Sequence, residues 1–102
     1  MAIINANDET FQQEIKDSKP VLVDFYADWC GPCKRLVPIL EEIDADRSDI
    51  KIVKVNVDSA EKVSHEFGVM SIPTIMVFKD GKAISKKVGL CTKEDLLEMI
   101  NI

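Results

Sequence analysis

The apolar positions of this chain predict an alternation of strands and helices. Residues 21–26 form a near-continuous apolar run, which is typical of a central strand buried on both faces. Further strands are expected at residues 3–4, 51–57, 74–78 and 83–88. The intervening segment Lys79-Asp80-Gly81-Lys82 predicts that the last two strands form a hairpin.

Apolar residues spaced three or four apart predict helices between these strands. Asn7 is expected to cap a first helix over residues 8–16, and Pro38 to kink a second over residues 33–45. A third is expected over residues 60–67, and a capping box of Thr92 and Asp95 opens the last. The order predicts an α/β fold: a central mixed sheet, with a parallel core and an antiparallel C-terminal hairpin, flanked by about four helices.

Length and charge narrow the class of protein. A chain of 102 residues is expected to form a single domain over residues 1–102. Its net charge of −5 argues against nucleic acid and against anionic membranes as partners, and solubility alone also accounts for it. The start lacks a basic segment followed by an apolar run, and no stretch approaches the roughly 20 apolar residues of a membrane helix. We therefore expect a cytoplasmic protein.

Two of the three cysteines, Cys30 and Cys33, form a Cys-x-x-Cys motif between the central strand and the second helix. The end of such a strand is a natural crevice, and the N-terminus of the following helix favours negative charge. A thiolate at Cys30 would therefore be stabilised, and the thiolate is the nucleophilic form. Two intervening residues place both sulfurs on one helical turn, and Pro32 suits that first turn.

A metal site and a structural disulfide are the alternatives to a redox dithiol. Tetrahedral zinc generally needs four ligands, and only His65 and Cys91 could join the pair, neither with a paired spacing. We therefore expect no metal. A structural disulfide is disfavoured in the reducing cytoplasm.

Two charged residues interrupt apolar strands. Asp24 lies within the run 21–26, so burial is expected to raise its pKa. It is either a proton acceptor for Cys33 or a buried carboxyl with a structural role, and its spacing does not decide between them. Lys54 either pairs with Asp24 across neighbouring strands or points to solvent.

The motifs around the dithiol resemble those of the thioredoxin family. Residues 23–34, VDFYADWCGPCK, are similar to its active-site segment. Residues 54–58, 68–74, 78–81 and 88–89 resemble further family segments, so the likeness covers essentially the whole chain. Tyr26 is a departure, since the family often has Trp there, and Met70 and Leu90 make the expected groove bulkier. Cys91 replaces a common apolar residue and is either a buried small hydrophobe or a third redox group.

This resemblance implies a general protein-disulfide reductase whose redox group is the reversible Cys30–Cys33 disulfide, with no further cofactor. Cys30 would attack a substrate disulfide, and Cys33 would resolve the mixed disulfide. Asp24, directly or through water, would take the proton from Cys33 and later return it, and Lys54 would lie beside Asp24. Pro73 would be a cis-proline facing the dithiol, which completes the implied catalytic set.

The resemblance also implies a docking surface, in which the Ile72 backbone pairs with an extended substrate and Gly89 permits close approach. Its members are Trp29, Gly31, Pro32, Met70, Ile72, Val88, Gly89 and Leu90. Ordinary packing is the alternative for the apolar ones. The implied partners are thioredoxin reductase or an equivalent electron donor and disulfide-containing target proteins, and a monomer is the simplest expectation. A scaffold that binds without turnover, or an isomerase or oxidant, remains as a rival, although Gly31-Pro32 resembles the reducing members.

Overall fold

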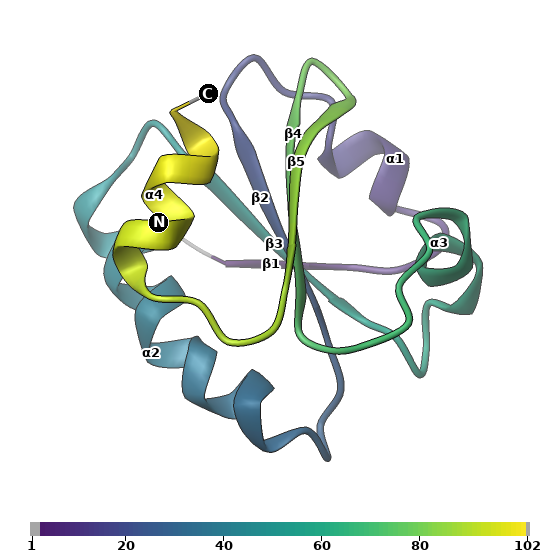
Figure 1. The fold of residues 1–102 in the computed structure, drawn as a ribbon. Coiled ribbons are helices and arrows are strands. Elements are labelled where there is room, and N and C mark those ends of the chain that lie inside the picture. The colour runs from purple at the N-terminus through teal and green to yellow at the C-terminus, as the bar shows by residue number, and fades with distance from the viewer. Residues whose placement is uncertain (1–2, 102) are drawn as a thin grey trace.

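A five-stranded mixed sheet is the centre of the molecule (Figure 1). The computed structural model describes residues 3–101, and the strand order within them is β1-β3-β2-β4-β5. β1 and β2 run parallel to β3, whereas β4 is antiparallel to both β2 and β5. The strands are β1 (Ile4–Ala6), β2 (Val21–Tyr26), β3 (Lys51–Asn56), β4 (Thr74–Lys79) and β5 (Lys82–Val88). The predicted mixed sheet with its C-terminal hairpin is confirmed.

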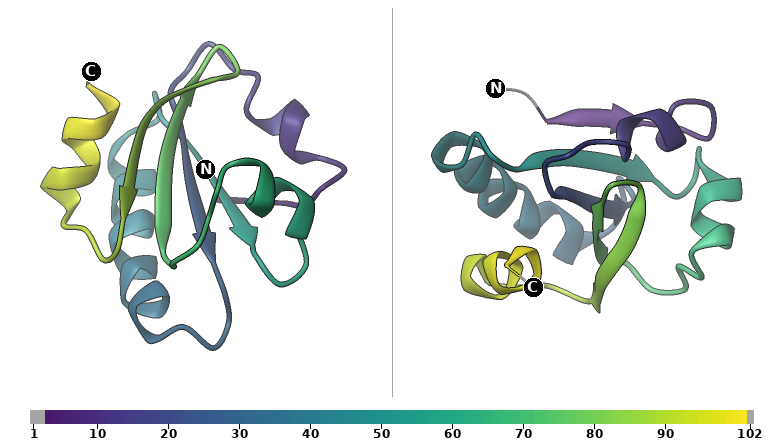
Figure 2. Two further views of the ribbon diagram at one scale, coloured as in Figure 1. Left: turned by 45° about the vertical axis from the view of Figure 1, so that its right-hand side comes forward. Right: turned by 90° about the horizontal axis from the view of Figure 1, so that it is seen from above.

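Helices cover both faces of this sheet (Figures 1 and 2). α2 and α4 pack on one face, and α1 and α3 lie on the other. Their bounds are α1 (Phe11–Glu14), α2 (Gly31–Asp46), α3 (Glu61–Glu66) and α4 (Lys93–Ile100). None of the helices within residues 3–101 is long and apolar enough to cross a membrane.

β2 contributes to the core on both sides of the sheet, because successive side chains of a strand point to opposite faces. Val21, Val23 and Phe25 join the core beneath α1 and α3, where Phe11, Phe25, Phe67 and Phe78 pack with ring centroids 5.3 to 6.2 Å apart. Leu22 joins the core beneath α2 and α4. Asp24 shares the face of Leu22, so a carboxyl group lies beneath α2 at the end of the strand that leads to Cys30.

The first helix is much shorter than the sequence predicts. Asn7 does accept hydrogen bonds through Oδ1, from the backbone N–H groups of Glu9 and Thr10 at 3.0 and 2.9 Å. These bonds stabilise a turn over residues 8–10, and regular helix begins only at Phe11. Asn side chains bond nearby backbone in this way and compete with helix formation. The prediction of Asn7 as a helix cap was therefore wrong: Asn7 stabilises the turn, and the N-cap residue of α1 is Thr10.

The predicted start of the last helix and the predicted hairpin turn are both confirmed. Thr92 Oγ1 accepts from the Asp95 N–H at 3.1 Å while Asp95 Oδ2 accepts from the Thr92 N–H at 3.1 Å, which is the expected capping box. The hairpin turns through Asp80 and Gly81, with φ values of 53° and 79°. Such a turn matches the twist of the flanking strands. α2 is one helical segment through Pro38, and the kink expected there stays a prediction.

Candidate active site

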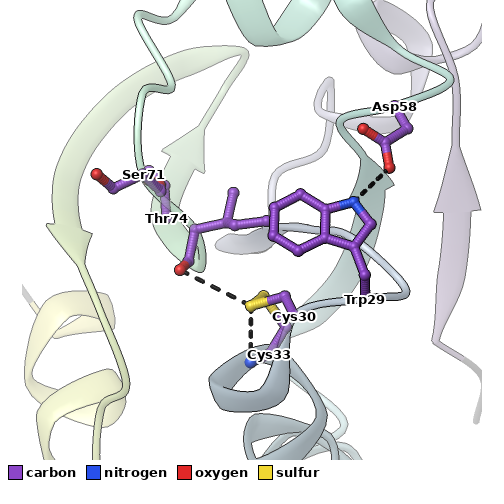
Figure 3. The surroundings of a disulfide bond; sticks show 7 residues. Trp29, Cys30, Cys33, Asp58, Ser71 and Thr74 are labelled. Atoms are coloured by element: carbon purple, nitrogen blue, oxygen red, sulfur yellow. Dashed lines mark hydrogen bonds between the residues drawn. A yellow bond between two sulfur atoms is a disulfide. The ribbon is translucent and has the colours of Figure 1, made fainter.

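Cys30 and Cys33 form a disulfide where β2 leads into α2 (Figure 3). Cys30 is the N-cap residue of α2, Cys33 lies in its first turn, and their Cα atoms are 5.2 Å apart. Both side chains are buried, and Ala27 packs with them. The predicted pairing of the two cysteines is therefore present in the structure.

The helix N-terminus is arranged to stabilise charge on Cys30. Cys30 has extended backbone angles, and its Sγ accepts a hydrogen bond from the Cys33 backbone N–H at 3.2 Å (Figure 3). Ser, Asp and Asn side chains take the same position at other helix N-termini. Pro32 lies in the first turn, where a missing N–H costs nothing. After reduction, a thiolate at Cys30 would receive this N–H bond and the favourable helix dipole.

A loop before β4 faces the dithiol. The Ile72–Pro73 peptide bond is cis, as the family resemblance implied. The Ile72 carbonyl oxygen lies 3.8 Å from Cys30 Sγ, so it can accept a hydrogen bond from the Cys30 thiol in the reduced protein. On the other side, the Gly89 N–H donates to the Pro73 carbonyl at 2.8 Å. The structure thus brings Ile72, Pro73 and Gly89 together beside Cys30.

Most of the large apolar side chains exposed within residues 3–101 belong to the predicted docking surface. Trp29 is 71% exposed, Met70 94%, Val88 55% and Leu90 48%. Exposure to this degree rules out ordinary core packing as the reason for these side chains. Ile72 differs, because it is half-buried and packs against the two cysteines. Gly31 is exposed and Pro32 half-buried, both at the start of α2.

Trp29 has a partner that the sequence analysis did not identify. Its indole Nε1–H donates to Asp58 Oδ2 at 2.9 Å (Figure 3). The Asp58 backbone N–H in turn donates to Asn56 Oδ1 at 2.9 Å, which ties the loop after β3 to the end of that strand. The two partners are 29 residues apart, so no local spacing indicates this contact. Asp58 therefore supports Trp29 beside the dithiol.

Asp24 is fully buried, and neither of its carboxyl oxygens has a hydrogen-bond partner within the described part of the chain. Burial raises its pKa to about 7, because a charged carboxylate is poorly solvated there, while the charge of Lys54 acts in the opposite direction. The predicted burial and the predicted direction of the pKa shift are both confirmed. The group can therefore exchange protons near neutral pH.

Lys54 lies opposite Asp24 in the register of β2 and β3, which confirms it as the neighbour of Asp24, but the direct ion pair, one of the two alternatives, does not form. Within residues 3–101, no ion pair joins the two side chains. The Lys54 ammonium instead lies 4.2 Å from the centroid of the Tyr26 ring. A long lysine side chain carries its charge toward the surface, where an aromatic face attracts it.

A cavity of about 150 Å³ opens beside the second cysteine. Its walls include Cys33, Tyr26 and Lys54, together with Ala27, Asp28, Lys34 and Val37. A water molecule occupies about 30 Å³ in the liquid, so this space can hold several. Although Cys33 is buried, it therefore lines a space large enough for water, together with Lys54.

Cys91 is separate from the dithiol. It is buried in the core beneath α2 and α4, and its Sγ donates to the Gly89 carbonyl at 3.3 Å. Burial raises the pKa of this thiol, which makes it less nucleophilic. The prediction of a buried small hydrophobe is confirmed. In the described residues, no group of three or more His, Cys, Asp or Glu side chains could hold a metal ion.

A cysteine pair at the start of a helix that follows a central strand, faced by a cis-proline, defines a thiol–disulfide oxidoreductase. A family model described as thioredoxin matches residues 2–102. Thioredoxin of Bacillus subtilis (strain 168) is 47% identical over 102 residues, which cover 99% of this chain and 97% of that protein. Thioredoxin of Rickettsia prowazekii (strain Madrid E) is 48% identical over 99 residues, or 95% and 94% of the two chains.

A solved structure agrees with these sequence comparisons. A mutant thioredoxin from Halobacterium salinarum NRC-1 superposes with a TM-score of 0.88 at 33% identity, covering 99% of this chain and 93% of that one. The chain belongs to the thioredoxin family. It is a protein-disulfide reductase whose redox group is its cysteine pair and not a bound cofactor.

Proposed function

We propose that this protein is a general reductase of disulfides in cytoplasmic proteins, acting as a monomeric, single-domain electron carrier with Cys30 as the attacking thiol. The observation that carries the assignment of Cys30 is its place at the N-cap of α2, where Sγ accepts the Cys33 N–H. That bond and the helix dipole both favour a thiolate at Cys30.

In the first step, the Cys30 thiolate attacks one sulfur of a substrate disulfide. The substrate S–S bond breaks as a mixed disulfide forms with Cys30, and the released substrate sulfur leaves as a thiolate that takes a proton from solvent. The Ile72 carbonyl, 3.8 Å from Cys30 Sγ, faces the attacking sulfur. Pro73 beside it presents no backbone N–H that would compete for the thiolate.

In the second step, Cys33 loses its proton and attacks the Cys30 sulfur. The mixed disulfide breaks, the Cys30–Cys33 disulfide forms, and the second substrate sulfur leaves as a thiolate that takes a proton from solvent, so two electrons have passed to the substrate. We assign the proton acceptor to Asp24, with Lys54 as its charged neighbour. The support for Asp24 is its burial beneath α2 and a pKa of about 7, which suits proton exchange at neutral pH.

Substrate docking is assigned to the apolar surface beside the dithiol. The Ile72 backbone would pair with an extended substrate segment, as a strand adds to an open backbone edge. The exposure of Trp29, Met70, Val88 and Leu90 supports this assignment. At Gly89, φ is 98° and no atom lies within 4 Å of an added Cβ, so the glycine serves a backbone conformation and leaves room for a substrate chain.

The oxidised dithiol must be reduced again after each turnover. We propose that thioredoxin reductase or an equivalent electron donor supplies the two electrons, and that diverse disulfide-containing proteins receive them. The protein would in this way transport electrons from the donor to its targets and contribute to cell redox homeostasis. Membership of the thioredoxin family supports these partners.

Reduction of insulin disulfides by dithiothreitol tests the proposal. The unmodified protein should accelerate the reaction strongly, and both Cys30→Ser and Cys33→Ser should abolish the acceleration. Cys91→Ser is the matched control, since Cys91 is buried away from the dithiol, and it should retain the activity. Acceleration that survives Cys30→Ser, or folded protein that gives none, would instead favour a binding role without turnover.

A further inference from the structure

Three polar side chains share one face of the sheet at the end that leads to the dithiol. Asp24 and Tyr26 are two residues apart on β2, so their side chains point to the same side. Lys54 is the register partner of Asp24 on β3, which places its side chain next to both. The Lys54 ammonium therefore has two candidate partners, the carboxylate of Asp24 and the ring of Tyr26.

The ammonium contacts the ring and not the carboxylate. Lys54 Nζ lies 4.2 Å from the Tyr26 ring centroid, well within the range of a cation–π interaction. Both Asp24 oxygens are buried without a hydrogen-bond partner in the described residues. Tyr26 is half-buried and lines the cavity that also reaches Cys33. The Tyr26 ring thus holds the Lys54 ammonium beside this cavity, whereas the Asp24 carboxyl group is fully buried.

Which of these two partners the Lys54 ammonium contacts affects how readily Asp24 accepts a proton. A cation in direct contact with a carboxylate strongly favours its charged form and makes it a weaker base. A general base works best when its pKa lies near the pH of the reaction. A carboxyl group that is buried beside a cation, but not paired with it, keeps the higher proton affinity that such a base needs.

We propose that Tyr26 is a positioning residue for the reaction: its ring binds the Lys54 ammonium and keeps it apart from the Asp24 carboxylate, which stays free to accept a proton. This inference rests on the proposed role of Asp24 as the proton acceptor. It assigns a function to the position at which the chain departs from the Trp often found in the family.

Few other titratable or charged groups face Asp24. Cys91, in the segment before α4, lies close enough to Asp24 for the two charges to interact, and Ile75, the register partner of Asp24 on β4, contributes only apolar surface. The pKa of the Tyr26 hydroxyl is raised mainly by burial, and the negative charge of Asp28 raises it further. Lys54 is the charge that opposes the effect of burial on the pKa of Asp24. Moving that one ammonium is therefore expected to change the proton affinity of Asp24.

Titration of the Asp24 carboxyl carbon by NMR, in the oxidised protein, tests the proposal without any substrate. In Tyr26→Leu the ammonium is released and can approach the carboxylate. The pKa of Asp24 should then fall by about one unit or more, a tenfold loss of proton affinity. Tyr26→Phe is the matched control, because it retains the ring face and should keep the pKa of the unmodified protein. Far-UV circular dichroism establishes that each variant is folded.

Tyr26→Leu in a Lys54→Met background distinguishes two causes of a lower Asp24 pKa. One is approach of the Lys54 ammonium to the carboxylate, and the other is entry of water into the site. If the ring acts through Lys54, the fall in pKa on Tyr26→Leu should disappear there. An unchanged or raised Asp24 pKa in Tyr26→Leu, or an equal fall in the Lys54→Met background, would overturn the proposal. Because no substrate is present, such a result is distinct from failure of the reductase function, which the insulin assay measures.

Discussion

Asp24 shows how one residue couples the stability of this protein to its chemistry. Its pKa is raised from an ordinary value of 3.8 to about 7 because burial disfavours the charged carboxylate. Above about pH 4 the unfolded chain releases this proton, whereas the folded chain keeps it until about pH 7. The free energy of unfolding must therefore fall as pH rises through that window, where the folded state binds more protons.

Asp24→Asn should remove this pH dependence. The variant is expected to gain stability relative to the unmodified protein between pH 4 and pH 8, by up to about 4 kcal/mol from a shift of roughly three pKa units. Urea unfolding at pH 4, 6 and 8 measures the difference. A stability difference that stays constant across these values would contradict the pKa assigned to Asp24.

Met70 should contribute to the binding of protein substrates but not to the chemical step. Met70→Ser is expected to lower kcat/KM for insulin about fivefold, equivalent to losing about 1 kcal/mol of docking energy. Its reaction with a small aromatic disulfide should not change. Ile84→Ser is the control, since Ile84 is also an exposed apolar residue but lies near the hairpin end of β5. An equal loss of kcat/KM for both substrates, or for both variants, would contradict the assignment of Met70 to a docking surface.

Individual residues were predictable where a local pattern marks them. A Cys-x-x-Cys motif and an acid inside an apolar run are visible in the sequence, and Cys30, Cys33 and Asp24 lie as those patterns predict. The bond from Trp29 to Asp58 and the contact of Lys54 with Tyr26 were not predictable. Both depend on side-chain geometry between segments that only the folded sheet brings together.

Elements were predicted best where their ends carry strong signals. The apolar run gave β2 its observed bounds, and the capping box marked the start of α4. The first helix was overextended because Asn7 caps a turn as readily as a helix, and sequence spacing does not distinguish the two. α2 begins at Gly31, two residues before its predicted start, since Cys30 is its cap.

The cap of α4 offers a test at this scale. Thr92→Ala should lower the free energy of unfolding by about 1 kcal/mol, because the Asp95 N–H loses its acceptor. Thr92→Ser retains a hydroxyl and should recover most of that loss. Guanidinium unfolding at neutral pH measures both variants. If serine is as destabilising as alanine, the capping bond is not the source of the effect.

At the scale of the whole molecule, the sheet links all the elements that meet at the dithiol. β2 lies between β3 and β4, so it connects Cys30 to Lys54 on one side and to the Pro73 loop on the other. The sequence predicted the mixed sheet from the order of elements and the resemblance. The position of each strand within it follows from packing between distant segments, which apolar periodicity does not encode.

A chain organised around one sheet should unfold as one unit. We expect far-UV circular dichroism and Trp29 fluorescence to report the same urea midpoint and the same slope for the oxidised protein. Adding a chelator should leave that midpoint unchanged, because the redox group is the cysteine pair. Separate midpoints for the two probes would contradict a single cooperative domain over residues 1–102, and a shift with chelator would indicate a structural metal.

The central claim is that Cys30 attacks the substrate and Cys33 resolves the mixed disulfide. Trapping tests it most directly: reduced Cys33→Ser and reduced Cys30→Ser are each incubated with a disulfide-containing protein and examined by mass spectrometry. The account predicts a stable mixed disulfide at Cys30 in Cys33→Ser and little adduct in Cys30→Ser. A stable adduct at Cys33 in Cys30→Ser, with none at Cys30 in Cys33→Ser, would contradict it.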